Sequence, residues 1–250
     1  MSAMPKKAMV LAAGLGLRMR PITTHTPKPL VAVAGRTMLD RVLDHLAAAG
    51  VEEAVVNLHH LPDVLRAHLA ARSEGPRVTL SDETDALLET GGGVKRALPL
   101  LGDAPFFVVN ADIVWLNGAR PALARLAEAW DPARMDALLL FKRTADAHGY
   151  DGAGDFFLDP DGVPTRRGEK QVAPHIFAGV QILSPQALED TPEGAWSLNL
   201  VFDRLLARGR LRAIAHDGPW FHVGTPDAIA PTEEKIRAAL AGEDFGEGSA

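Results

Sequence analysis

Short apolar runs alternate along the first half of the chain with segments in which apolar residues recur at helical spacing. The clearest helical segment has Leu39, Val42, Leu43 and Leu46 at the i, i+3, i+4 and i+7 positions. Short apolar runs predict strands that are buried on both faces, which is typical of a parallel sheet covered by helices. The expected strands of this half are 8–11, 54–58, 78–81, Phe106–Asn110 and 137–141.

Capping residues, glycine and proline mark the ends of the predicted helices. Thr37 and Asp40 resemble a capping box at the start of the first helix, and Gly50 follows its last alanines as a stop signal. Pro62 and Pro121 stand where two further helices are expected to begin. Repeated strand–helix units of this kind favour an α/β fold.

The pattern changes after Lys142. Residues 146–175 are rich in Asp, Gly and Pro, which predicts a hairpin or an irregular lobe. Strands are expected over 176–183, Leu211–Ala215 and 220–223, a helical stripe over 198–206, and a last helix from about Pro226 to about Leu240. The tail beyond that helix is expected to be frayed. The fold class predicted is α/β: a Rossmann-like, mixed, mainly parallel sheet with helices on both faces and a small additional lobe.

Charge and composition narrow the class of protein. The 250 residues carry 26 basic and 32 acidic side chains, a net charge of −6, which argues against a nucleic-acid partner. A local basic cluster would still suffice for a single nucleotide. The chain has no cysteine, so disulfides and thiolate metal sites are excluded. No apolar run reaches the roughly 18 residues of a membrane span, and the N-terminus lacks a signal-peptide pattern. We therefore expect no membrane partner and a cytoplasmic location.

The segment from Leu11 to Leu30, LAAGLGLRMRPITTHTPKPL, follows the first predicted strand and is rich in small residues. Small residues let backbone N–H groups approach a phosphate closely. Arg18, as a planar fork, and Lys28, as a point charge, are suited to neutralising a triphosphate. The segment is not a P-loop, which requires G-x-x-x-x-G-K-[ST], and Met19 occupies the place of the third glycine of a dinucleotide fingerprint.

Four further motifs carry polar or small residues suited to a binding site. Asn110 and Asp112 follow the strand at Phe106–Asn110, at the strand end where open α/β sheets bind ligands. The other three are LETGGG at 88–93, which precedes a short helix expected near 93–98, GAGDF at 152–156, and WFHVGTP at 220–226. Each motif also has a purely structural interpretation. Asp112 would be a solvated loop residue, LETGGG a flexible loop at a helix start, GAGDF a hairpin turn, and His222 of WFHVGTP a packed histidine.

Together these motifs resemble the signature of the sugar-1-phosphate nucleotidyltransferases, in which LAAG-x-G-x-R precedes a T-x-x-x-PK segment. The resemblance runs from Ala8 to about Leu240 and implies the nucleotide-diphospho-sugar transferase fold. It implies a single domain over 1–250, made of a nucleotide-binding half at 1–141, a sugar-phosphate-binding half at 142–225, and a C-terminal helix and tail at 226–250. The implied reaction converts an NTP and a hexose 1-phosphate into an NDP-sugar and pyrophosphate.

The resemblance also implies roles for individual residues. Arg18, Lys28 and Asp112 would be catalytic, and Asn110 and Asp155 would contact the sugar phosphate. The residues implied in nucleotide binding are Ala13, Gly14, Gly16, Leu17, Arg18, Lys28, Glu89 and Gly92. Leu17 replaces a usual polar residue, so its contact would come from the backbone. A phosphate monoester is largely ionised near pH 7, so no activated serine or cysteine nucleophile is needed.

A divalent cation, Mg²⁺, is a further implication of the resemblance. The family holds it with an aspartate at the position of Asp112 and a second aspartate in W-x-D-x-G-T-P, where this chain has His222. Imidazole is a poor ligand for Mg²⁺ but a good one for Mn²⁺ or another transition metal, so these ions are also expected. Three interpretations stay open: His222 binds the ion directly, contacts it through water, or leaves it to Asp112 and phosphate.

The first motif, ETGGG and GDF are most similar to N-acetylmuramate-1-phosphate uridylyltransferases of cell-wall sugar recycling, which implies UTP and N-acetylmuramate 1-phosphate as substrates. The same segments occur in mannose-1-phosphate guanylyltransferases. Two alternatives belong to other classes: a non-catalytic nucleotide-sugar sensor, which would release no pyrophosphate, and a glycosyltransferase, which would release free UDP. No pattern in the chain predicts an oligomeric state.

Overall fold

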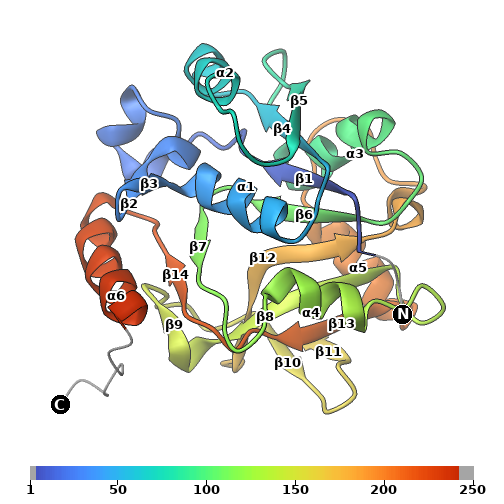
Figure 1. Ribbon diagram of the computed structural model, residues 1–250. Coiled ribbons are helices and arrows are strands. Elements are labelled where there is room, and N and C mark those ends of the chain that lie inside the picture. The colour runs from blue at the N-terminus through green and yellow to red at the C-terminus, as the bar shows by residue number, and fades with distance from the viewer. Residues whose placement is uncertain (1–3, 242–250) are drawn as a thin grey trace.

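A nine-stranded mixed sheet runs through the centre of the computed structural model, which describes residues 4–241 (Figure 1). Four parallel strands form one part of it in the order β5–β4–β1–β6. These strands are Arg77–Asp82, Glu53–Leu58, Lys7–Leu11 and Phe106–Asn110. Because all four run in the same direction, their carboxyl ends meet at one edge of the sheet, and the loops that leave them share that edge.

The later strands extend the sheet beyond β6. β12 (His175–Leu183) is antiparallel to β6 on one side and to β8 (Ala137–Arg143) on the other, and β13 (Leu211–Ala215) is parallel to β8. The mixed, mainly parallel sheet predicted from the sequence is therefore confirmed. β6, from the half of the chain before residue 141, and β12, from the half after it, are hydrogen-bonded neighbours in this sheet.

Helices cover both faces of the sheet. One face carries α1 (Met38–Ala48), α2 (Pro62–Ala70) and α4 (Ala122–Ala129), and the other carries α3 (Glu89–Leu101) and α5 (Asn199–Ala207). Alternate residues of one strand separate between the two cores. In β1, Ala8 and Val10 pack in the first core and Met9 packs in the second, all with no exposed surface. This two-sided burial is why the strand appears as a continuous apolar run.

Smaller pieces complete the second half. β7 (Ile113–Trp115), β14 (Trp220–His222) and β9 (Ala147–His148) form a three-stranded sheet, and β10 (Phe156–Leu158) and β11 (Pro164–Arg166) form a hairpin on β12. The hairpin expected within 146–175 and the strand expected at 220–223 are confirmed. The three-residue strand β7 was not predicted, and it is what draws β14 into the small sheet.

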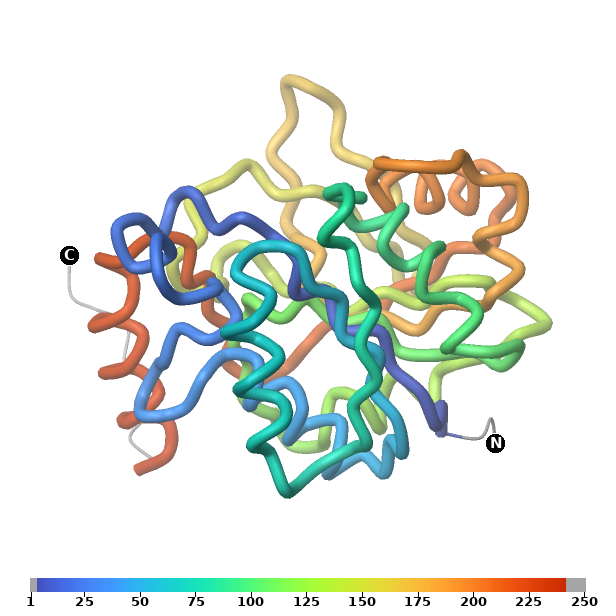
Figure 2. The backbone as a smooth tube through the Cα atoms, turned by 90° about the horizontal axis from the view of Figure 1, so that it is seen from above, coloured from blue at the N-terminus to red at the C-terminus, as the bar shows by residue number. Residues whose placement is uncertain are grey.

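The C-terminal helix α6 (Ile229–Ala241) packs beside the short hairpin of β2 (Ala32–Val33) and β3 (Arg36–Thr37). The side chain of Glu233 accepts a hydrogen bond from the backbone N–H of Ala34 at 2.8 Å. Figures 1 and 2 show α6 on the side of the molecule away from the N-terminus. The tail for which fraying was expected lies outside the described residues.

Helix α3 corrects the sequence analysis. A short helix was expected near 93–98 after a glycine loop, but the helix begins at Glu89 and ends at Leu101, so all three glycines lie inside it. The physical reason is close packing rather than chain flexibility. A Cβ on Gly91 would lie 2.1 Å from the ring of Trp196, and one on Gly92 would lie 2.1 Å from the carbonyl oxygen of Gly194. Helix propensity alone disfavours glycine, so tertiary contact decides this element.

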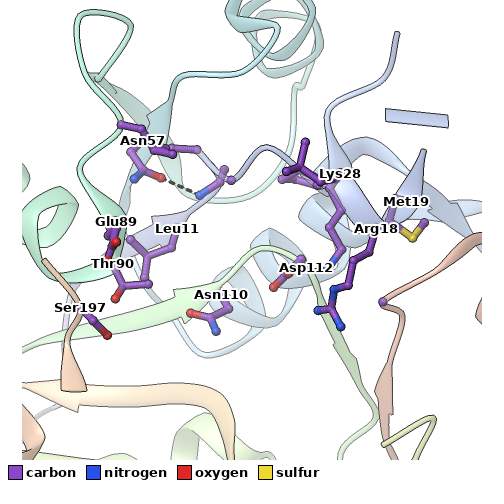
Figure 3. Close-up of a pocket in the computed structure, with 18 residues that line it drawn as sticks. Leu11, Arg18, Met19, Lys28, Asn57, Glu89, Thr90, Asn110, Asp112 and Ser197 are labelled. Atoms are coloured by element: carbon purple, nitrogen blue, oxygen red, sulfur yellow. Dashed lines mark hydrogen bonds and ion pairs between the residues drawn. The ribbon is translucent and has the colours of Figure 1, made fainter. Parts of the chain in front are cut away.

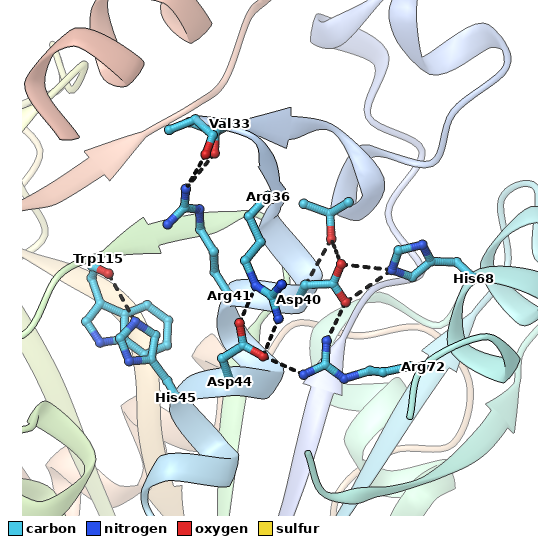
Figure 4. Close-up of polar contacts among 11 residues, drawn as sticks. Val33, Arg36, Asp40, Arg41, Asp44, His45, His68, Arg72 and Trp115 are labelled. Carbon is cyan, nitrogen blue, oxygen red and sulfur yellow. Dashed lines mark hydrogen bonds and ion pairs between the residues drawn. The ribbon is translucent and has the colours of Figure 1, made fainter. Parts of the chain in front are cut away.

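A network of ion pairs joins α1, α2 and the β2–β3 hairpin (Figure 4). The Thr37 side chain accepts from the Asp40 N–H at 3.0 Å, which confirms the predicted cap of α1. Arg72, whose side chain is 9% exposed, donates to Asp40 at 2.6 Å and to Asp44 at 2.5 Å. Arg36 pairs with the same Asp44 carboxylate. These shared carboxylates fix the hairpin that directly follows the Lys28 segment.

Among residues 4–241, no helix combines the length and the apolar character required to cross a membrane.

Gly91→Ala is expected to lower the free energy of unfolding by about 1–3 kcal/mol, because the added methyl group overlaps the Trp196 ring. For a domain of this size the melting temperature would fall by about 2–12 °C. The control is Gly168→Ala, in an exposed loop where the nearest atom is the end of the Gln171 side chain at 3.1 Å. Equal melting temperatures for the two variants, measured by calorimetry, would contradict the close packing.

Candidate active site

A cavity of about 520 Å³ opens over the carboxyl ends of β1, β4 and β6 (Figure 3). This is the edge of the sheet at which open α/β folds bind ligands. Most lining residues come from the Leu11–Leu30 motif, and the others come from β4, the end of β6, the turn before β7, the start of α3 and two later segments. The lining residues are Leu11, Ala12, Ala13, Gly14, Gly16, Leu17, Arg18, Met19, Lys28, Pro29, Asn57, Leu87, Glu89, Thr90, Asn110, Asp112, Ser197 and Gly224.

The loop after β1 is held by polar groups behind it. The backbone N–H of Ala12 donates to Asn57 Oδ1 at 2.6 Å, and Asn57 Nδ2 donates to Glu83 Oε1 at 2.8 Å. Asn57 is 2% exposed and Glu83 is fully buried. Burial raises the pKa of the Glu83 carboxyl, and the hydrogen bond from Asn57 opposes that shift. This chain of hydrogen bonds fixes the first turn of the loop.

Gly16 is required by the turn that follows. Its φ is +61°, and a Cβ there would lie 2.9 Å from Lys28 Cβ and 3.0 Å from Thr23 Cγ2. Thr23 Oγ1 donates to the Gly16 carbonyl at 2.8 Å and closes the contact. Gly14 is different, because a Cβ there meets nothing within 4 Å. Its bare backbone faces open space beside the cavity, as a close approach by a ligand requires.

Lys28 and Asp112 form an ion pair at one end of the cavity. Lys28 Nζ lies 2.6 Å from Asp112 Oδ2, and the two side chains are 10% and 40% exposed. Lys28 lies on a short 3-10 turn, and Asp112 lies between β6 and β7. Arg18 lines the same end and, among residues 4–241, its guanidinium makes no hydrogen bond or ion pair. An exposed, unpartnered guanidinium beside a buried ammonium is a suitable place for phosphate groups.

Asn110 lines the cavity between its two ends (Figure 3). It is the last residue of β6, beside the irregular stretch of β12 between Phe177 and Gln181. Gly179 lies in that stretch with φ +80°, and a Cβ there would come within 3.1 Å of Asn110 Nδ2. The bulge in β12 therefore leaves room for the Asn110 amide.

The far end of the cavity is lined by Glu89, Thr90 and Ser197. Gly92 is one turn away and does not line the cavity, although nucleotide contact was expected from it. Its N–H and that of Gly91 both donate to the carbonyl of Trp196, at 3.2 and 2.8 Å. The glycine motif thus supplies packing, while Glu89 and Thr90 face the cavity.

Two other residues predicted for the site lie outside the cavity lining. Asp155 accepts a hydrogen bond from the Phe177 N–H at 3.0 Å, so its carboxylate joins the loop before β10 to β12. His222, on β14, folds its ring over Gly224, where a Cβ would lie 2.6 Å from His222 Nε2. Burial lowers the pKa of His222, and the charges of Lys28 and Arg18 lower it further, so the imidazole is neutral at pH 7.

The donor groups near Lys28 are compatible with a divalent cation that takes most of its ligands from substrate and water. Asp112 offers one half-exposed carboxylate with Oδ2 on Lys28. Mg²⁺ commonly binds proteins through one or two carboxylates plus phosphate oxygens, which this donor set matches. Within the described residues no group of three or more His, Asp or Glu side chains is arranged to hold a metal ion.

The sequence analysis missed the supporting residues Asn57, Glu83, Thr90 and Ser197. Asn57 had a usable signal, because it is the polar residue of an otherwise apolar stretch in a strand whose residues are all buried. A buried amide needs hydrogen-bond partners, and here they are the cavity loop and Glu83. Ser197 had no such signal, since its place depends on how the segment before α5 crosses α3.

Comparison with known proteins gives a consistent result. Residues 8–183 match the MobA-like NTP transferase domain family. The chain is 46% identical over 242 residues to an N-acetylmuramate alpha-1-phosphate uridylyltransferase of Caulobacter vibrioides, covering 96% of this chain and all of the relative. A protein of the same description from Neisseria meningitidis is 36% identical over 88% of this chain and 93% of its own length. The resemblance drawn from the motifs is confirmed.

Two further likenesses are more distant. A mannose-1-phosphate guanyltransferase of Aspergillus fumigatus is 30% identical over 88% of this chain, which spans 61% of that protein. The crystal structure of HddC from Yersinia pseudotuberculosis, complexed with GMP-PN, superposes with a TM-score of 0.73 at 24% identity, over 92% of this chain and 99% of that one. This structural likeness supports the fold.

Glu83→Gln is expected to raise stability at neutral pH. A raised carboxyl pKa in the folded state means that stability is greatest below the unfolded value, about 4.3, and is lost as pH rises through the folded value. Glutamine keeps the acceptor for Asn57 and removes the buried charge. The variant should therefore gain on the order of 1 kcal/mol over the parent protein between pH 4 and pH 8.

Thermal unfolding of both proteins across that pH range measures the gain. Glu189→Gln, at an exposed position, is the control and should show no pH-dependent difference. A stability difference for Glu83→Gln that does not grow with pH would show that this carboxyl is not destabilised by burial.

Proposed function

The chain belongs to the MobA-like NTP transferase family, and from this premise we propose that it transfers a uridylyl group from UTP to N-acetylmuramate 1-phosphate, releasing pyrophosphate. The observation that carries the proposal is the full-length similarity to the Caulobacter uridylyltransferase. The cavity supports it, because Arg18, Lys28, Asp112 and Asn110 all line one space. The reaction would serve cell-wall sugar recycling in the cytoplasm.

The proposed chemistry requires two anions to meet. The sugar phosphate is already ionised near pH 7, so its oxygen can attack the α-phosphorus of UTP without a general base. The barrier is then mainly the repulsion between the phosphates and the correct alignment of the reacting groups. Lys28 would lie against the α-phosphate and the sugar phosphate, and Arg18 against the departing pyrophosphate. Asn110 would hold a sugar hydroxyl.

A divalent cation is part of the proposal. Asp112 would hold it, and when bound it would supply positive charge beside the triphosphate. Lys28 would then exchange part of its contact with Asp112 for a phosphate oxygen. The neutral imidazole of His222 would face the same region, directly or through water.

The substrates are tested by a panel of the four ribonucleoside triphosphates against several sugar 1-phosphates, with pyrophosphate and NDP-sugar as readouts. UTP with N-acetylmuramate 1-phosphate should give the highest kcat/KM. Preference for GTP with mannose 1-phosphate would replace the proposal with the guanylyltransferase. Nucleotide binding without pyrophosphate under any divalent ion would indicate a sensor, and release of free UDP would indicate a glycosyltransferase.

Lys28→Ala is expected to reduce turnover by at least about 10²–10³-fold, because a charge that stabilises the transition state is lost. Asp112 is partly exposed, so it tolerates the loss of its partner and the fold should persist. The control is Arg134→Ala, which removes an exposed cation outside the cavity and should leave turnover unchanged. Near-normal activity in Lys28→Ala would refute the assigned role.

His222→Asp tests the second metal position. A carboxylate suits Mg²⁺ better than imidazole does, so the ratio of activity with Mg²⁺ to activity with Mn²⁺ should rise in the variant. His25→Asp adds the same charge at an exposed position outside the cavity lining and should not change the ratio. If both variants keep the parent ratio, position 222 has no part in binding the ion.

A further inference from the structure

The two ends of the cavity differ in chemistry (Figure 3). Arg18, Lys28 and Asp112 lie at the charged end. Glu89, Thr90 and Ser197 lie at the other, with Asn110 between. Phosphates belong at the charged end, so the nucleoside of a bound nucleotide extends toward Glu89. A carboxylate at that end meets a part of the ligand that carries hydrogen-bond donors and no negative charge.

Glu89 is held in an unusual backbone conformation. Its φ is +57°, in the left-handed region that favours glycine, although it is the first residue of α3. Such a conformation costs about 1–3 kcal/mol for a residue with a Cβ, and it persists only where the surroundings impose it. Glycine would fit the same backbone without that cost. The formation of helix α3 therefore does not explain why this position carries a glutamate rather than a glycine.

Contacts of the residues that directly follow Glu89 impose this conformation. The Trp196 carbonyl accepts from the Gly91 and Gly92 N–H groups at 2.8 and 3.2 Å. The Leu198 N–H donates to Thr90 Oγ1 at 2.9 Å. The segment of residues 196–198 thus clamps the start of α3 and leaves the Glu89 side chain on the cavity.

The Glu89 carboxylate is itself exposed. Among residues 4–241 it accepts no hydrogen bond from a side chain or backbone group and forms no ion pair. An ionised carboxylate is an acceptor only, so its ligand must supply donors. It therefore has acceptor capacity that the protein leaves unused at the nucleoside end.

A ribonucleoside offers donors of two kinds. The 2′- and 3′-hydroxyls are adjacent and can each donate to one oxygen of the same carboxylate, as acidic residues do with ribose in dinucleotide sites. The uracil edge has one N–H between two carbonyl oxygens, and those oxygens would repel a carboxylate. The diol is the better match, because it offers one donor for each carboxylate oxygen and presents no carbonyl oxygen that would repel the carboxylate.

Resting on the proposed function, we propose that Glu89 binds the ribose 2′,3′-diol of the nucleotide and thereby selects ribonucleotides over deoxyribonucleotides. The strain at Glu89 is tolerated because glycine, the less strained residue, could not make this contact. Thr90 and residues 196–198 act as positioning groups for the carboxylate.

The test compares UTP with 2′-deoxy-UTP and 3′-deoxy-UTP in the parent protein, Glu89→Gln and Glu89→Gly. The parent should favour UTP over each deoxy analogue by about 10–100-fold in kcat/KM, as expected for a hydrogen bond to a charged group. The preference should shrink in Glu89→Gln and fall to within about threefold of unity in Glu89→Gly. The melting temperature of Glu89→Gly should be equal or higher, because the strained residue is removed.

Asp190→Gly is the matched control. Asp190 is exposed, has φ +56° and lies outside the cavity, so this variant relieves similar backbone strain without touching the site. It should keep the full preference for UTP. A preference that is unchanged in Glu89→Gly would overturn the proposal. So would a change confined to the choice of base or to the KM of the sugar phosphate.

Binding of the same three nucleotides by calorimetry separates this inference from the proposed function. Absence of pyrophosphate from the parent protein would refute the reaction, whereas the binding preference for UTP and its loss in Glu89→Gly would still support the diol contact. Equal binding of UTP and both deoxy analogues by the parent would refute the contact even if turnover is normal.

Discussion

A buried ammonium group is the constraint around which the cavity is organised. Lys28 lies almost out of contact with solvent, where an unpaired charge would cost several kcal/mol, and the Asp112 carboxylate 2.6 Å away offsets that cost. The pairing fixes the distance between the first motif and the end of β6. It also depends on Gly16, since any side chain there would displace Lys28. Because Asp112 is partly exposed, the buried charge remains accessible to an anion that enters the cavity.

The sequence predicted the parts of the molecule that follow local rules. β1, β4 and β6 are buried on both faces, so each was predicted from an apolar run in the sequence. The capping residue Thr37 predicted the start of α1. The charged end of the site followed from one continuous motif and one strand end. Features that depend on contacts between distant segments were not predicted. The glycines of α3 predicted a loop, because nothing nearby in the sequence indicates their packing role. The ring of Trp196, which lies against Gly91, comes more than 100 positions later in the chain.

The same limit explains where the structure places the predicted site residues. Gly92 and Asp155 were assigned from short glycine-containing pieces, and the structure uses both in packing or turn contacts outside the cavity. Asn57 and Glu83 lie on or after predicted strands, yet no spacing rule describes their contacts: Asn57 accepts from the backbone N–H of Ala12 and donates to Glu83. Local pattern identifies which residues can carry charge to a ligand. Burial and hydrogen-bond partners decide which of them face the cavity.

The hydrogen bond from Leu198 to Thr90 spans 108 positions, and it has a consequence for how the protein matures on the ribosome. A nascent chain that has emerged through β6 and β7 already contains the ammonium, the guanidinium and the carboxylate of the charged end. It does not yet contain Trp196 or Leu198, so nothing clamps the first turn of α3. The clamp at the start of α3 therefore forms only once residues 196–198 have been synthesised and have docked, later than the residues of the charged end.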